Sequence, residues 1–174
     1  MHHKYSLWIV PTGETGTQLQ NLINQFADEY NAPKFTPHVT IAGITASDEE
    51  LVNVKSKISK LASQQDVFTI NLTDYGYKDE NHRCLYRQAI SKQLDFTFQN
   101  AAKLFPEAKI EHFRSMPHVS IMYGKYPASL KQKIIEKLSV STKSFEANEI
   151  SLCLTDGAEE DWHLVYTAKL SSST

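Results

Sequence analysis

Apolar residues recur at helical spacing in four segments of the chain. In residues 17–30, Leu19, Leu22, Ile23 and Phe26 fall on one face of a helix with 3.6 residues per turn. Such a stripe is typical of a helix that packs one side against a core. The same spacing predicts three further helices, at residues 51–61, 92–104 and 128–138.

Local signals mark the ends of two of these helices. Ser47 lies just before the second helix and Glu50 follows three residues later, which is a capping-box pattern. Pro106 follows the third helix and ends it, because proline cannot continue the helical hydrogen bonding.

Short runs rich in β-branched and aromatic residues alternate with these helices and predict strands. They give about six or seven mostly antiparallel strands beside about four helices, which is an α+β fold. The predicted strands are residues 5–10, 38–44, 67–77, 84–90, 118–123, 143–154 and 162–170.

One five-residue pattern, Pro-His-Val-(Thr/Ser)-Ile, occurs twice. It lies in residues 36–43 (TPHVTIAG) and again in residues 116–124 (MPHVSIMYG), once in each half of the chain. Each copy begins a predicted strand and is followed by a loop and a helix. We therefore expect residues 1–174 to form a single domain of two pseudo-symmetric lobes. Each lobe would be an antiparallel sheet with helices packed outside, and a cleft would lie between them.

Strand geometry places the polar residues of each copy together. Residues two apart in a strand point to the same face, so His38 and Thr40 project together, as do His118 and Ser120. Proline cannot donate a hydrogen bond to the ladder, so it is tolerated at the first residue of a strand. The proline before each histidine therefore marks where the strand starts. If the lobes face each other, two imidazoles and two hydroxyls converge in the cleft.

This group of side chains suits phosphoryl chemistry. One neutral imidazole can take a proton from water while a protonated one gives a proton to a leaving oxygen. The hydroxyls of Thr40 and Ser120 can donate hydrogen bonds to oxygens that gain charge in the transition state. In-line attack at phosphorus needs such an arrangement and no metal ion or other cofactor in principle.

Two alternatives compete with this interpretation. A single His-x-Thr is close to meaningless, and a chance repeat is the first alternative. The second is a metal site built from His38, His118 and His112 or His163, but no closely spaced set of ligands supports it. We expect His82, which follows a turn, to be a surface residue.

Composition and charge limit the possible partners. The apolar fraction of 41 % and the charged fraction of 22 % are ordinary for a soluble globular protein. The net charge is −2 and the basic residues are scattered, so no basic stripe for long nucleic acid is visible. If phosphate is the target, a small molecule is expected and not a duplex, with no stable nucleic-acid complex and no membrane association. We expect a cytoplasmic monomer.

The two cysteines are too few for a disulfide scaffold. Cys84 and Cys153 each lie in an apolar strand-like run, and we expect both to act as small buried hydrophobes. A disulfide or a redox pair is the alternative. The apolar residues near the N-terminus stop at Pro11 without a small-residue cleavage site, and we expect them to form a first strand.

The paired motif resembles the signature of the two-histidine (2H) phosphoesterase superfamily. Residues 5–11 (YSLWIVP), 118–124 (HVSIMYG), 77–86 and 162–165 (WHLV) are similar to segments of the plant and fungal cyclic phosphodiesterases. The resemblance covers nearly the whole chain. It implies metal-independent hydrolysis of ADP-ribose 1″,2″-cyclic phosphate, a by-product step of tRNA splicing, and opening of nucleoside 2′,3′-cyclic phosphates to 2′-phosphates.

By this resemblance His38 and His118 are the acid/base pair, and Thr40 and Ser120 donate to the phosphoryl oxygens. Tyr123 is a further phosphate contact. Strict alternation puts Tyr123 on the face opposite Ser120, so it reaches the cleft only if the strand bends or ends there, which Gly124 permits.

The resemblance also implies that Trp8 stacks on the substrate at the cleft wall, but a core position is the alternative for Trp8. Trp162 is expected in the core.

Three functions follow from these residues. The first is the cyclic phosphodiesterase, a 2′,3′-cyclic-nucleotide phosphodiesterase type of hydrolase. The second is a 2′–5′ RNA ligase or RNA-end phosphodiesterase of the same superfamily, against which the absence of a basic stripe weighs. The third is a nucleotide-binding module without turnover. The intact histidines and hydroxyls favour an enzyme.

Overall fold

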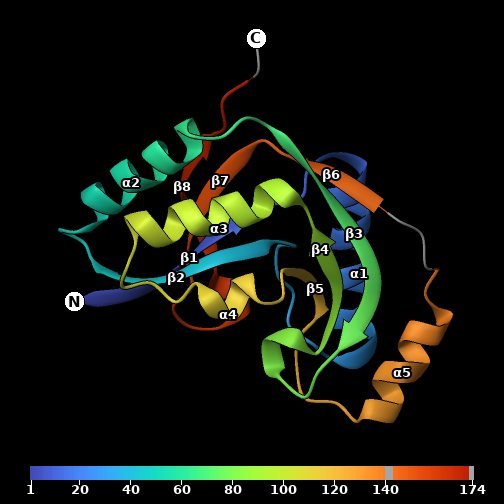
Figure 1. The fold of residues 1–174 in the computed structure, drawn as a ribbon. Coiled ribbons are helices and arrows are strands. Elements are labelled where there is room, and N and C mark those ends of the chain that lie inside the picture. Colours follow the sequence, from blue (N-terminus) through green and yellow to red (C-terminus); the bar gives the residue numbers. More distant parts are fainter. Residues whose placement is uncertain (140–142, 173–174) are drawn as a thin grey trace.

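A computed structural model of the chain describes residues 1–139 and 143–172. Its centre is one eight-stranded sheet with the order β6-β3-β4-β5-β2-β1-β7-β8, and all neighbouring strands run antiparallel (Figure 1). The α+β prediction is therefore confirmed. The strands are β1 (His2–Ile9), β2 (Val39–Ser47), β3 (Phe68–Tyr77), β4 (Leu85–Ile90), β5 (His118–Met122), β6 (Lys143–Ala147), β7 (Glu149–Leu154) and β8 (His163–Lys169).

The two predicted lobe sheets are the two halves of this sheet. The first half is β6-β3-β4-β5, and the second is β2-β1-β7-β8. They meet where β2 and β5 pair, and Val39 opposite Val119 is the one register pair there within the described residues. The first half comes from residues 68–147, while the second comes from the two ends of the chain. The lobes are therefore nested in sequence and do not follow each other.

Two of the helices, α1 and α3, pack against the half of the sheet that the other segment of the chain forms. α1 follows β1 in the chain, yet it packs against β5 and β6 of the other half. α3 comes from the central segment but packs against β2 and α2, and α2 lies on β7 and β8 (Figure 1). The helices are α1 (Gly13–Tyr30), α2 (Leu51–Ser63), α3 (Lys92–Leu104), α4 (Glu111–Arg114) and α5 (Ala128–Lys137), and the single-turn 3₁₀ helices are η1 (Asn81–Arg83) and η2 (Glu159–Asp161).

The four predicted helices are all present. The predicted stripe of the first helix is largely buried, with Leu19, Ile23 and Phe26 each at most 5 % exposed. Ser47 and Glu50 make the two reciprocal bonds of the predicted capping box, because the Ser47 amide donates to the Glu50 carboxylate at 2.8 Å and the Glu50 amide donates to the Ser47 hydroxyl at 3.4 Å. These bonds lie in the turn before α2, whose N-cap residue is Glu50 and has no side-chain cap bond, so the prediction of Ser47 as N-cap is wrong.

One predicted strand is wrong. Residues 143–154 were expected to form a single strand, but Asn148 divides them into β6 and β7. β6 pairs with β3 at one edge of the sheet, whereas β7 lies between β1 and β8 in the other half. The break allows one stretch of the chain to contribute a strand to each half of the sheet. The short α4 was also not predicted.

Both cysteines are buried and free. Cys84 and Cys153 are fully inaccessible to solvent, and neither forms a disulfide. Their expected role as small buried hydrophobes is confirmed. Within the described part of the chain, no helix is both long and apolar enough to cross a membrane.

Candidate active site

The two histidines have the same local geometry. His38 and His118 each follow a proline at the start of a strand, His38 directly before β2 and His118 as the first residue of β5. The Nδ1 atom of His38 is 2.7 Å from the carbonyl oxygen of Thr36, and Nδ1 of His118 is 2.8 Å from that of Met116. A carbonyl can only accept, so Nδ1 carries the proton in both rings. The neutral form of each ring therefore offers Nε2 as a base.

Both histidines line one cavity of about 260 Å³ at the junction of the two sheet halves. The valine between each histidine and its hydroxyl residue points to the other face, and both valines are fully buried. The predicted convergence of two imidazoles and two hydroxyls is therefore present in the structure. The lining includes His38, Thr40, Glu80, Asn81, His82, Arg83, His112, His118, Ser120 and Tyr123.

The cavity favours neutral imidazoles. Burial lowers the pKa of His38 from 6.5 to about 3, with smaller contributions from His118 and His82. Burial also lowers the pKa of His118, to about 4, and the positive charge of Arg83 acts in the same direction. At neutral pH both rings are therefore uncharged, and each can accept a proton. An anion bound beside either ring would raise its pKa, because an opposite charge favours the protonated form.

The two hydroxyls are not equivalent. Ser120 is 4 % exposed, and its Oγ donates a 2.6 Å hydrogen bond to the backbone carbonyl of His82. Thr40 is half-buried, and no hydrogen bond of its hydroxyl is found within the described residues. Thr40 can donate to a ligand directly, whereas Ser120 has to rotate its hydroxyl away from His82 first.

Tyr123 reaches the cavity because its strand ends. β5 stops at Met122, and Gly124 has φ of +132°, a conformation that residues with a Cβ rarely adopt. Tyr123 therefore lines the cavity, and its ring stacks on Phe35 with centroids 3.7 Å apart. Burial raises the pKa of the phenol, so it stays protonated and is a hydrogen-bond donor.

Trp8 lies against His38 and is not among the described residues that line the cavity. Its ring is 2 % exposed and stacks on the His38 imidazole, with centroids 3.7 Å apart and planes within 10°. In the β1–β2 register Trp8 pairs with Thr40, and His38 is its diagonal neighbour on the same face. Trp8 is therefore buried against His38, and its stacking on substrate stays a prediction. Trp8 also borders a separate cavity of about 230 Å³, together with Phe35 and Trp162.

Arg83 and His82 also line this cavity, although neither was predicted from the sequence as a site residue. Arg83 of η1 is 5 % exposed and lines the cavity, and its Nη2 donates to the His112 carbonyl at 2.7 Å. Its Nη1 lies 3.8 Å from the Glu80 carboxylate. Among the lining residues that the structure describes, Arg83 is the one lysine or arginine. An arginine in a polar turn gives no sequence signal that it is buried.

His82 is exposed, as expected, but it also borders the cavity. Its Nε2 is 3.1 Å from the Glu159 carboxylate, and the Asn81 amide lies 3.4 Å from the same oxygen. The β3–β4 connection is thereby joined to the β7–β8 connection beside the site. In the part of the chain that the structure describes, no group of three or more His, Cys, Asp or Glu side chains is arranged to hold a metal ion.

Known proteins are similar to this chain in sequence or in fold. The curated cyclic phosphodiesterase of Arabidopsis thaliana is 25 % identical over 183 aligned positions, which cover 96 % of this chain and 95 % of the relative. The crystal structure of TT0787 from Thermus thermophilus matches with a TM-score of 0.68 at 13 % identity, covering 98 % of this chain and all of that one. LigT of E. coli, crystallised with phosphate, matches with a TM-score of 0.62 at 14 % identity, covering 98 % and 99 %.

The two structural matches show a common fold. The family assignment comes from the family model described as the 2′-5′ RNA ligase superfamily, which matches residues 13–159, including both histidine motifs. The chain therefore belongs to the 2′-5′ RNA ligase superfamily of two-histidine phosphoesterases.

Proposed function

We propose that the protein is a cyclic phosphodiesterase that hydrolyses nucleoside 2′,3′-cyclic phosphates to 2′-phosphates, with ADP-ribose 1″,2″-cyclic phosphate as a second substrate of the same chemistry. One observation carries the proposal. Two imidazoles from opposite halves of the sheet line one cavity, and each has its Nδ1 proton held by a backbone carbonyl. The name of the Arabidopsis relative supports the cyclic substrate class.

The reaction requires one neutral and one protonated imidazole. The neutral Nε2 takes a proton from water as the water oxygen forms a bond to phosphorus. The phosphorus–O3′ bond breaks on the opposite side, and the protonated Nε2 gives its proton to O3′. The products are the 2′-phosphomonoester and a free 3′-hydroxyl, so one water is consumed. The anionic substrate favours protonation of one ring, because its negative charge raises the pKa of the imidazole beside it.

Donors around the cavity stabilise the phosphoryl oxygens. Thr40 offers a hydroxyl without a competing bond in the described residues, and Tyr123 offers a protonated phenol. Arg83 adds a positive charge that is shielded from solvent. Ser120 joins these donors once its hydroxyl leaves the His82 carbonyl.

The test is the conversion of a nucleoside 2′,3′-cyclic phosphate in excess EDTA, with the product identified by ³¹P NMR. Formation of the 2′-phosphate alone is the expected result. ADP-ribose 1″,2″-cyclic phosphate is then assayed under the same conditions. Saturable binding without product would overturn the enzymatic proposal and favour a nucleotide-binding module.

A second candidate function is an RNA-end phosphodiesterase or 2′–5′ ligase, which the name of the matching family model favours. Oligonucleotides that end in a 2′,3′-cyclic phosphate test it. Affinity that falls steeply with salt would indicate several phosphate contacts along a strand. Equal turnover of mononucleotide and oligonucleotide, with a shallow salt dependence, would favour the cyclic mononucleotide.

A further inference from the structure

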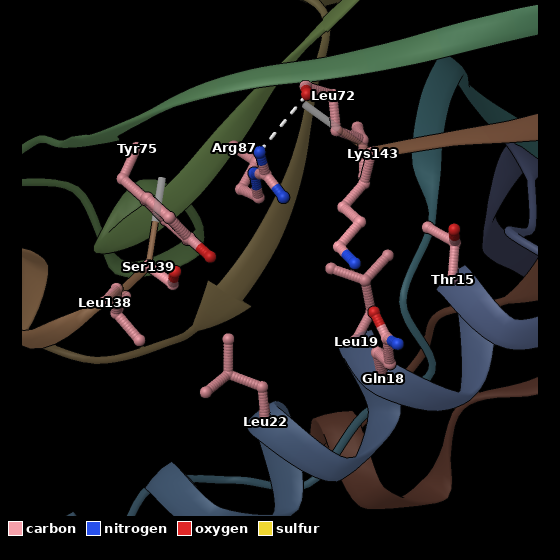
Figure 2. Close-up of a pocket in the computed structure, with 10 residues that line it drawn as sticks. All are labelled: Thr15, Gln18, Leu19, Leu22, Leu72, Tyr75, Arg87, Leu138, Ser139 and Lys143. Carbon is pink, nitrogen blue, oxygen red and sulfur yellow. Dashed lines mark hydrogen bonds between the residues drawn. The ribbon is translucent and has the colours of Figure 1, made fainter. Parts of the chain in front are cut away.

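A second cavity, of about 360 Å³, lies between α1 and the first half of the sheet. Figure 2 shows its lining, with Leu19 and Leu22 from α1 on one side and Arg87 of β4 and Lys143 of β6 on the other. Leu138, which directly follows α5, also contributes. The volume falls within the range of about 300–1,000 Å³ that is usual for small-molecule sites.

This cavity lies on the face of the sheet opposite the histidines. Arg87 is the register partner of Val119, and paired residues of antiparallel strands point to the same face. His118 and Ser120, the two neighbours of Val119, point to the other face and line the histidine cavity. The second cavity is thus lined by Arg87 of β4 and the histidine cavity by His118 and Ser120 of the neighbouring β5, and no described residue lines both.

Two cations line the second cavity, Arg87 of β4 and Lys143 of β6. The Arg87 guanidinium is 3 % exposed and donates to the carbonyl oxygens of Leu72 and Thr73 at 2.8 to 3.2 Å. It also lies over the Tyr75 ring, 4.8 Å from the centroid. The Lys143 side chain extends from β6 toward α1 (Figure 2), and no ion pair of its amine is found within the described residues. No aspartate or glutamate occurs among the described lining residues.

The α1 side of the cavity is mixed, because Thr15 and Gln18 line it beside two leucines. Leu19 and Leu22 lie one turn apart on α1, and both line the cavity with Leu138. Leu22 and Leu138 are half-buried, so they present apolar surface that the protein's own side chains cover only in part. A ligand that fits both sides has a small anionic head and a flexible apolar body. Because Arg87 already donates to two carbonyl oxygens, the ammonium of Lys143 is the main partner for the head, and a monoanion matches its single charge.

We propose that this cavity binds a medium-chain aliphatic carboxylate. The carboxylate lies at Lys143 near Arg87, and the alkyl chain lies on Leu19, Leu22 and Leu138. The site is separate from the histidine cavity, and the proposal does not rest on the proposed function.

The test uses decanoate below its micelle concentration, titrated into the full-length protein by isothermal titration calorimetry. The expected result is saturable binding with one site per chain. Lys143→Gln should weaken it by at least about tenfold, which corresponds to the loss of one charge-assisted contact. Lys169→Gln is the matched control, because Lys169 is exposed on β8 at the other end of the sheet, and its affinity should equal that of the original protein.

Leu22→Trp fills the cavity without removing either cation and should abolish decanoate binding. Circular dichroism shows whether this variant is folded, and Lys143→Gln keeps the test decisive if it is not. Decanol, which has the same chain without charge, should bind at least about tenfold more weakly than decanoate. Equal binding of decanol and decanoate, unchanged affinity in Lys143→Gln, or no saturable binding of decanoate would each overturn the proposal.

Discussion

Val39 of β2 lies directly opposite Val119 of β5 where the two halves of the sheet meet. Each valine stands between the histidine and the hydroxyl residue of its motif. Because both valines point into the core, both histidines point to the other face, into one cavity. This single pairing therefore sets the position of one histidine relative to the other.

Replacing either His38 or His118 with Ala should lower the rate of cyclic phosphate hydrolysis by a factor of at least about 10². Each variant removes one member of an acid/base pair that acts in the same step. Initial rates with a nucleoside 2′,3′-cyclic phosphate measure the effect.

His163 provides the matched control for these variants. Its Nδ1 lies 2.9 Å from the Asp161 carbonyl oxygen, the same two-residue relationship, but the residue is exposed and does not line the cavity. His163→Ala should keep the original rate. An unchanged rate in His38→Ala or His118→Ala would contradict the acid/base assignment.

Trp8 should act through His38. Trp8→Phe keeps a ring against the imidazole and should retain most of kcat, whereas Trp8→Ala removes it. We expect Trp8→Ala to lower kcat more than it changes KM, and to destabilise the fold by about 3–5 kcal/mol, as is usual for a truncated buried aromatic residue. Urea unfolding and steady-state kinetics measure the two effects. If Trp8→Ala raised KM and left kcat and stability unchanged, Trp8 would instead stack on the substrate.

Arg83 should contribute to the binding of the anionic phosphoryl group. Arg83→Gln removes the buried charge, and we expect kcat/KM to fall by about tenfold or more. Arg114→Gln is the control, because Arg114 pairs with Asp95 at 2.9 Å on the surface and does not line the cavity. Circular dichroism confirms the fold of both variants before the assay. Equal kcat/KM in the two variants would remove Arg83 from the site.

Acid should destabilise the protein through its buried histidines. The unfolded chain binds a proton at His38 near pH 6.5, whereas the folded protein binds it only near pH 3. Between these values the unfolded state holds more protons, so the free energy of unfolding falls as the pH is lowered. At pH 5 this amounts to about 2 kcal/mol for His38. Urea denaturation at pH 7 and pH 5 measures it.

A glutamine at position 38 does not titrate in this range and isolates the contribution of His38. The His38→Gln variant should lose less stability than the original protein between pH 7 and pH 5. The same loss in both proteins would show that His38 is protonated in the folded state at pH 5.

Local patterns predicted the elements and the main site residues. The alternation in Pro-His-Val-Thr-Ile fixes both the strand and the face of each side chain, so His38 and Thr40 could be placed together from sequence. Features that depend on tertiary contacts could not be found in this way. Asn148 separates β6 from β7 without a glycine or proline signal, because the two strands belong to different halves of the sheet.

The contacts that place Arg83 and Trp8 in the site were harder still to predict. Arg83 follows a polar turn and is buried only because the chain near His112 lies against it. Stacking of Trp8 on His38 requires the β1–β2 register, including the register shift between Leu7 and Trp8. Neither contact has a periodicity that a sequence alone would show.

The packing of α1 and α3 has a consequence for folding. Each half of the sheet buries part of its apolar surface under a helix contributed by the other segment, α1 on β5 and β6 and α3 on β2. Neither segment could complete its own core if it were expressed alone. Although the molecule has two lobes, it should unfold in a single cooperative transition. Limited proteolysis between the lobes should therefore release no stably folded fragment.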